Sequence, residues 1–121
     1  MGKKILIVDD ENRLVQNIKM FLELHGYAVV TALTGNDGID VAQAERPDLI
    51  VLDIIMPGLD GTSTAEILKE KSVTRSTPII FLSGLLSGQD DGGDGQTTEY
   101  RLAKPFEMDK LLAMIKSIIG E

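Results

Sequence analysis

Five polar side chains follow apolar runs of this sequence, at points where a buried strand would end. Asp9 and Asp10 follow KILIV, and Asp53 follows LIVL. Ser83 ends the run PIIFLS, and Lys104 comes directly after YRLA. An ionised carboxylate beside such apolar residues is costly unless a positive charge pairs with it. Asp53 in particular needs a partner, because the residues that follow it, IIMP, offer no helix start for it to cap.

These residue types suit phosphoryl chemistry if the fold brings them together. Clustered carboxylates repel one another, which favours protonation or the binding of a cation. Oxygen ligands suit Mg²⁺, which takes few protein carboxylates and keeps waters. A carboxylate can also attack phosphorus, while a metal ion, a lysine and a hydroxyl stabilise the phosphoryl oxygens. Each residue alone also has a plainer interpretation, since Asp9, Asp10 or Ser83 can cap a helix and Lys104 can be an ordinary solvated lysine.

The strands that end in these residues must be neighbours for the side chains to meet. Apolar runs alternate with stretches of helical periodicity, which favours a parallel sheet with helices on both faces. The expected strands are 4–8, 27–32, 48–53, 78–83 and 100–103, and the expected helices are 11–24, 34–45, 62–71 and 107–119. Five such strands commonly take the order 2-1-3-4-5, a doubly wound, flavodoxin-like α/β fold that binds ligands at the carboxyl ends of its strands. All five side chains would then lie along one edge of the sheet.

One segment departs from this alternation. GLLSGQDDGGDG, residues 84–95, has five glycines and three aspartates where a fourth helix is expected. Each interior glycine costs a helix about 1 kcal/mol. We therefore predict a weak or missing fourth helix and a mobile segment from Gly84 to Thr98. An EF-hand loop that began at Asp90 would need ligands where the chain has Gly92 and Arg101, so a flexible acidic loop is the expectation here.

Composition limits the classes of function. The chain has 121 residues, 43% of them hydrophobic, which suits a single domain spanning 1–121. The formal net charge of −7 and the scattered basic residues argue against direct nucleic-acid binding. No apolar stretch approaches the ~20 residues of a membrane helix, and MGKK lacks the apolar stretch of a signal peptide. The absence of cysteine excludes thiolate chemistry and suits a reducing cytoplasm, which is the expected location.

Four motifs together carry a family resemblance. ILIVDDE, VLDIIMPGLDG, PIIFLSG and LAKPF resemble, in order along the whole chain, the motifs of response regulator receiver domains. These are the phospho-acceptor domains of two-component signalling. Asp53 resembles the phosphorylated aspartate of the family. Asp9 and Asp10 resemble the acidic pair that holds Mg²⁺ with Asp53, and the backbone carbonyl of Ile55 would complete that site.

The resemblance also implies roles for residues of the later motifs. Ser83 resembles the hydroxyl residue that closes on the phosphoryl group, and Lys104 resembles the family's lysine. Pro105 resembles the proline after that lysine, usually joined by a cis bond, and Gly61 the glycine after the loop beyond the phosphorylated aspartate. A sensor histidine kinase or a histidine phosphotransfer protein would supply the phosphoryl group. A downstream effector or output domain would read the switched surface, so the domain would not turn over a separate substrate.

Two features depart from the family pattern, and one is the glycine- and aspartate-rich segment 84–95, which replaces much of a helix that is commonly part of the family's signalling surface. The family usually has an aromatic residue three positions before the lysine, where this chain has Arg101, and Tyr100 should face the other side of the sheet. In the family, the residues two positions after the phosphorylated aspartate and two after the hydroxyl residue flank the approach of a hydrolytic water, and the resemblance places Ile55 and Leu85 there. Because neither side chain can orient water, we expect slow loss of the phosphoryl group.

Three other classes of protein fit parts of the pattern. A flavodoxin-like flavin binder needs a phosphate loop rich in serine, threonine and glycine after the first strand, where DDEN would repel a phosphate. A haloacid-dehalogenase-type phosphatase has a second aspartate two positions after its nucleophile, where this chain has Ile55. A receiver-like interaction module that works without phosphorylation is the principal alternative, and labelling by a small phospho-donor with Mg²⁺ would separate it from a phospho-acceptor.

Overall fold

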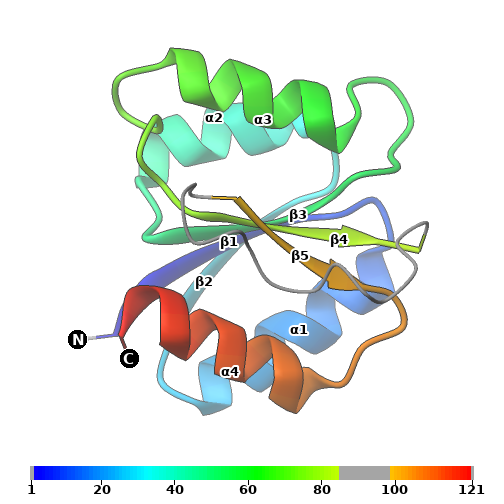
Figure 1. Ribbon diagram of the computed structural model, residues 1–121, viewed down its shortest axis with the longest axis vertical. Helices are drawn as coiled ribbons and strands as arrows, with labels where there is room; N and C mark the ends of the chain where they lie inside the picture. The colour runs from blue at the N-terminus through cyan, green and yellow to red at the C-terminus, as the bar shows by residue number, and fades with distance from the viewer. Residues whose placement is uncertain (1, 85–98, 121) are drawn as a thin grey trace.

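The computed structural model describes residues 2–84 and 99–120 of the chain. One parallel sheet has the strand order β2-β1-β3-β4-β5, which confirms the predicted topology (Figure 1). Its strands are β1 Lys4–Val8, β2 Ala28–Ala32, β3 Leu49–Asp53, β4 Ile79–Ser83 and β5 Glu99–Ala103. The helices within the described residues are α1 Asn12–Leu24, α2 Gly35–Glu45, α3 Gly61–Glu70 and α4 Met108–Ile119. The predicted weak or missing helix lies outside the described residues, apart from Gly84.

Helices cover both faces of the sheet, α2 and α3 on one and α1 and α4 on the other (Figure 1). Successive strand residues point to opposite faces, so an apolar strand supplies two cores. In β1, Ile5 and Ile7 pack with α1 and α4, whereas Leu6 and Val8 pack with α2 and α3. All four side chains are at most 1% exposed. The continuous apolar runs of β1, β3 and β4 therefore reflect strands that are buried on both faces.

The helix starts partly follow the sequence-based expectations. Thr34 caps α2, because its Oγ1 accepts a hydrogen bond of 3.0 Å from the N–H of Asp37. At α1 the N-cap is Glu11, whose side chain makes no capping hydrogen bond. Asp9 instead accepts the backbone N–H of Glu11 at 2.9 Å. Neither Asp9 nor Asp10 is the N-cap of α1, so the plainer interpretation of this pair as helix caps is wrong.

The parallel register brings the ends of four strands to the same edge. Val8 of β1 is paired with Leu52 of β3, so Asp9 comes next to Asp53 along the sheet. Ser83 of β4 is paired with Ala103 of β5, and Lys104 follows. Within the described ranges, no helix has the length and apolar character needed to span a membrane.

Candidate metal and phosphoryl site

Three aspartates meet at the carboxyl edge of the sheet. One carboxylate oxygen each from Asp9, Asp10 and Asp53 lies within 4.8 Å of the other two. Asp9 is fully buried and Asp53 is 4% exposed, whereas Asp10 is exposed at the mouth. A small cluster of carboxylates, open to water on one side, fits a hard cation such as Mg²⁺, which keeps part of its hydration shell. The structure therefore brings together the three side chains that the sequence proposed as metal ligands.

The backbone after β3 folds back onto the end of the strand and shapes this edge. The N–H of Gly61 donates to the carbonyl of Ile54 at 2.8 Å. A Cβ at Gly61 would lie 2.1 Å from the carbonyl oxygen of Asp53. Only glycine fits so close an approach, because both contacting groups are backbone. The start of α3 thus rests directly against the residue that carries the central carboxylate.

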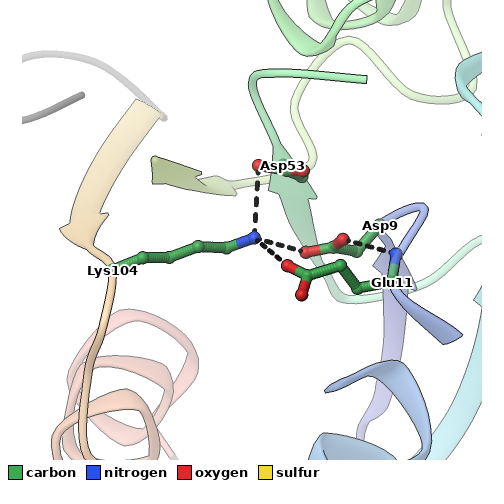
Figure 2. Close-up of polar contacts among 4 residues, drawn as sticks. All are labelled: Asp9, Glu11, Asp53 and Lys104. Carbon is green, nitrogen blue, oxygen red and sulfur yellow. Dashed lines mark hydrogen bonds and ion pairs between the residues drawn. The ribbon is translucent and has the colours of Figure 1, made fainter. Parts of the chain in front are cut away.

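Lys104 bridges the acidic residues from the opposite side (Figure 2). Its Nζ lies 3.0 Å from Asp9 Oδ2, 3.1 Å from Glu11 Oε1 and 3.5 Å from Asp53 Oδ1. The backbone N–H of Lys104 donates to the carbonyl of Ser83, and the bond to Pro105 is cis, as the resemblance implied.

Glu11 is the residue of this constellation that sequence reasoning missed. It belongs to the motif ILIVDDE, but it lies beyond the strand end, where an exposed glutamate usually has no specific partner. Only the three-dimensional path of Lys104, which reaches across the edge from β5, shows the contact. A search for acidic residues next to the proposed metal ligands could have marked Glu11 as a candidate.

Burial and charge shift the protonation of the central groups. The pKa of Asp53 is raised to about 6, chiefly by burial and next by the neighbouring charge of Asp9, while Lys104 and the N–H of Ile55 act in the opposite direction. Burial lowers the pKa of Lys104, but the hydrogen bonds to Asp9 and Glu11 and the charges of Asp9 and Asp53 together outweigh it, so the pKa is raised overall. The lysine therefore remains an ammonium, and Asp53 is a carboxylate held in unfavourable surroundings. Carboxyl groups whose pKa is shifted in this way are common at functional sites.

The remaining residues proposed from the sequence differ in how far they are buried. Ser83 ends β4 at the same edge and is 1% exposed. Ile55 is 55% exposed. Leu85, the second residue predicted to flank the approach of water, lies outside the described residues.

Tyr100 and Arg101 face opposite sides of the sheet, as predicted from strand alternation. Tyr100 packs against the core under α1 and α4. Arg101 is exposed and lines a groove of about 260 Å³ together with Phe81 and residues of α3. No aromatic side chain therefore occupies the Arg101 position on the α3 face.

A family model described as the response regulator receiver domain matches residues 5–116. The chain belongs to this family. Among curated receivers, it is 33% identical to Protein PilH of Pseudomonas aeruginosa, with 97% of this chain and 98% of PilH covered. It is 36% identical to the alkaline phosphatase synthesis transcriptional regulatory protein PhoP of Bacillus subtilis, with 98% of this chain but 49% of PhoP covered. The receiver therefore spans about half the length of PhoP-type relatives and nearly all of PilH.

Solved receiver structures agree with this fold. The chemotaxis protein CheY4 of Vibrio cholerae superposes with a TM-score of 0.85 at 30% identity, over 98% of this chain and 99% of CheY4. The receiver domain of the sensor histidine kinase PA1611 of Pseudomonas aeruginosa gives a TM-score of 0.84 at 28% identity, with both chains fully covered. That receiver has a magnesium ion coordinated in its active-site cleft. Among the described residues of this chain, Asp9, Asp10 and Asp53 form the group of acidic side chains that could hold a metal ion.

Proposed function

We propose that Asp53 is the phospho-acceptor of this receiver domain and that residues 1–121 act as one phosphorelay module. A sensor histidine kinase or a histidine phosphotransfer protein supplies the phosphoryl group. One observation carries the proposal: the Asp53 carboxylate ends a buried strand within reach of both a lysine ammonium and two further carboxylates. A structural aspartate needs one partner, whereas this arrangement has ligands for a cation and a counter-charge for an anion.

The proposed transfer uses the chain's own groups in defined roles. A carboxylate oxygen of Asp53 attacks the phosphorus of a phosphohistidine, an oxygen–phosphorus bond forms, and the phosphorus–nitrogen bond breaks. The electron pair stays on the imidazole nitrogen, which takes up a proton from water. Lys104 pairs with a phosphoryl oxygen, and the Ser83 hydroxyl donates a hydrogen bond to another. Asp9, Asp10, Asp53 and the carbonyl of Ile55 would hold Mg²⁺, which neutralises the remaining phosphoryl charge.

The domain then acts through its surface. We propose that movement of Ser83 towards the phosphoryl group changes the face around β4 and β5, which a downstream effector protein or an output domain reads. The module undergoes its own phosphorylation and slow dephosphorylation and does not turn over a separate substrate. It works in the cytoplasm and contacts neither nucleic acid nor membrane directly. The net charge of −7 and the scattered basic residues argue against nucleic-acid binding.

Labelling with radioactive acetyl phosphate and Mg²⁺ tests the acceptor. We expect labelling of the wild-type protein, none of Asp53→Asn, and none of either protein in EDTA. Asp60→Asn is the matched control, because Asp60 belongs to the same loop but lies outside the cluster. Labelling of Asp53→Asn at the wild-type level, or labelling that is indifferent to EDTA, contradicts the proposal. An unlabelled wild type would favour the phosphorylation-independent interaction module.

A slow loss of the phosphoryl group is the second expectation. Hydrolysis requires a water in line with the phosphorus, and Ile55 offers no group to hold it. We expect Ile55→Asn, combined with Leu85→Glu, to accelerate dephosphorylation by about tenfold, less than the roughly 10²- to 10⁴-fold of a general acid or base, because these groups only orient the water. A decay time course of the labelled protein measures this. Decay within minutes in the wild type, unchanged in the double variant, would contradict it.

A further inference from the structure

The Lys104 ammonium is held by more acidic groups than its proposed role requires. It has three N–H donors, and hydrogen bonds to Asp9 and Glu11 occupy two of them, at 3.0 and 3.1 Å. The ion pair with Asp53 is longer, at 3.5 Å. Figure 2 shows both shorter contacts on the side of the loop between β1 and α1. Lys104 Nζ therefore lies closer to the acidic groups of this loop than to Asp53, whose phosphoryl group it is proposed to bind.

Glu11 is placed in a way that a structural helix cap does not explain. It is the N-cap residue of α1, yet its side chain makes no capping hydrogen bond. Glutamate is also not among the residues that cap well. Its backbone N–H donates to Asp9 Oδ1 and its carboxylate reaches Lys104, so these two contacts are directed into the site, while its carbonyl accepts the N–H of Val15 in α1.

We propose that Glu11 is a positioning residue that holds Lys104 on the α1 side of the site and releases it when a phosphoryl group is added to Asp53. This inference rests on the function proposed above for Asp53 and Lys104. Glu11 then sets how readily the phosphorylated state forms, although it touches neither the phosphoryl group nor the metal. It weakens the phosphorylated state by competing for the same ammonium.

The burial of the three carboxylates indicates which contact is released. Asp9 is fully buried, so loss of its ion pair would leave a charge without solvent. The Glu11 side chain is 63% exposed, and water can replace the lysine there at little cost. Exposed pairs of this kind contribute little, so the competition corresponds to about a 1.5- to 5-fold change in an equilibrium constant. Such a contact suits a restraint that must be broken in each signalling cycle.

Beryllofluoride, a stable phosphoryl mimic, tests the competition with Mg²⁺ at saturation for each variant. Glu11→Ala removes the contact and the charge, and we expect its beryllofluoride affinity to rise about 1.5- to 5-fold. Glu11→Asp keeps the charge but is one methylene too short to reach, and we expect a similar rise. Because Glu11→Asp does not relieve repulsion of an anion, its gain isolates the released lysine. Glu23→Ala, which removes a charge from the far end of α1, should bind beryllofluoride as the wild type does.

Two further measurements, both made without beryllofluoride, complete the test. The ¹³C signal of the Lys104 ε-methylene should shift in both Glu11 variants and stay unchanged in Glu23→Ala. The Mg²⁺ affinity should fall in Glu11→Ala, because a negative charge is lost and the freed lysine pairs with Asp53. A merely structural effect on the fold would weaken both ligands together rather than in opposite directions.

The outcomes separate this inference from the proposed function. A wild-type protein that binds no beryllofluoride overturns the function proposed for Asp53. Wild-type binding with an unchanged affinity in Glu11→Asp overturns the role of Glu11 alone. An equal gain in Glu23→Ala would show a general effect of net charge and would also overturn it.

Discussion

Asp53 and Asp60 stand at the two ends of the connection between β3 and α3, and their surroundings act on them in opposite ways. Burial, followed by the charge of Asp9, raises the pKa of Asp53 to about 6. Hydrogen bonds from the backbone N–H and side chain of Ser63 lower the pKa of Asp60, which caps α3. The fold therefore favours the neutral form of one carboxyl and the ionised form of the other.

The contrast separates a carboxylate that stabilises the folded chain from one whose burial is costly to it. Asp60 lies in water and contributes a cap, an interaction that stabilises the folded chain. Asp53 is an ionised group in a buried acidic cluster, which opposes folding unless a cation such as Lys104 or a bound metal ion offsets its charge. Three substitutions examine this contrast, and we take them from the largest expected effect to the smallest.

Gly61→Ala acts on the backbone between the two aspartates and should have the largest effect. The new Cβ would lie 2.1 Å from the carbonyl oxygen of Asp53 and 2.7 Å from the Cα of Ile54. Backbone atoms at both points cannot move independently, so we expect a loss of roughly 2–4 kcal/mol in the free energy of unfolding. Urea denaturation measures this loss. Gly84→Ala is the control, because nothing lies within 4 Å of its added Cβ, and equal stability of the two variants would contradict the prediction.

Asp53→Asn should stabilise the metal-free protein at neutral pH. The raised pKa means that the folded state binds the proton more tightly, so the stabilising contribution of the protonated carboxyl is complete below about pH 3.8 and lost as the pH rises through about 6. Asparagine resembles the protonated form at every pH. We expect a gain of about 1–3 kcal/mol above pH 6 that disappears towards pH 4. Denaturation in EDTA across this range checks it.

Added Mg²⁺ provides the control for this prediction. The ion should stabilise the wild type by binding its folded state and should stabilise Asp53→Asn much less. A variant that is less stable than the wild type at neutral pH without metal would show that Asp53 supports the fold, as Asp60 does.

The sequence predicts a strand well where burial on both faces restricts the residue types that fit. Strands buried on both faces must be continuously apolar, so β1, β3 and β4 were recognisable, and the point at which each run ends located Asp9, Asp53 and Ser83. The strand order came from the common arrangement of such folds and was confirmed. Helix starts were less accurate, since α3 begins at Gly61, one residue before the expected position, with Asp60 as its cap.

The exposed part of the site was harder to predict for a physical reason. Burial restricts which residue types fit, but an exposed glutamate is acceptable almost anywhere on a surface. Glu11 could therefore be placed only once the reach of Lys104 across the sheet edge was known. The same reasoning applies to Asp60, which has the residue type of a metal ligand but the position of a helix cap. In this protein, the position of a carboxylate relative to the strand ends decides whether it caps a helix or joins the acidic cluster.

Asp60→Ala should have the smallest effect and completes the contrast. Its Oδ1 accepts the N–H of Ser63 at 2.8 Å, and alanine leaves this donor to water. We expect the melting temperature to fall by about 2–5 °C, whereas Asp60→Asn, which can still cap, should melt near the wild type. Because the pKa of Asp60 is lowered, its stabilisation is present above its ordinary pKa of 3.8 and is lost as the pH falls below that value. The deficit of Asp60→Ala should therefore shrink in acid. The gain of Asp53→Asn shrinks there too but has the opposite sign, because Asp60 stabilises the fold when it is ionised and Asp53 does so when it is protonated. Calorimetric melting at several pH values measures both trends, and a deficit that grows in acid would remove the distinction between the two aspartates.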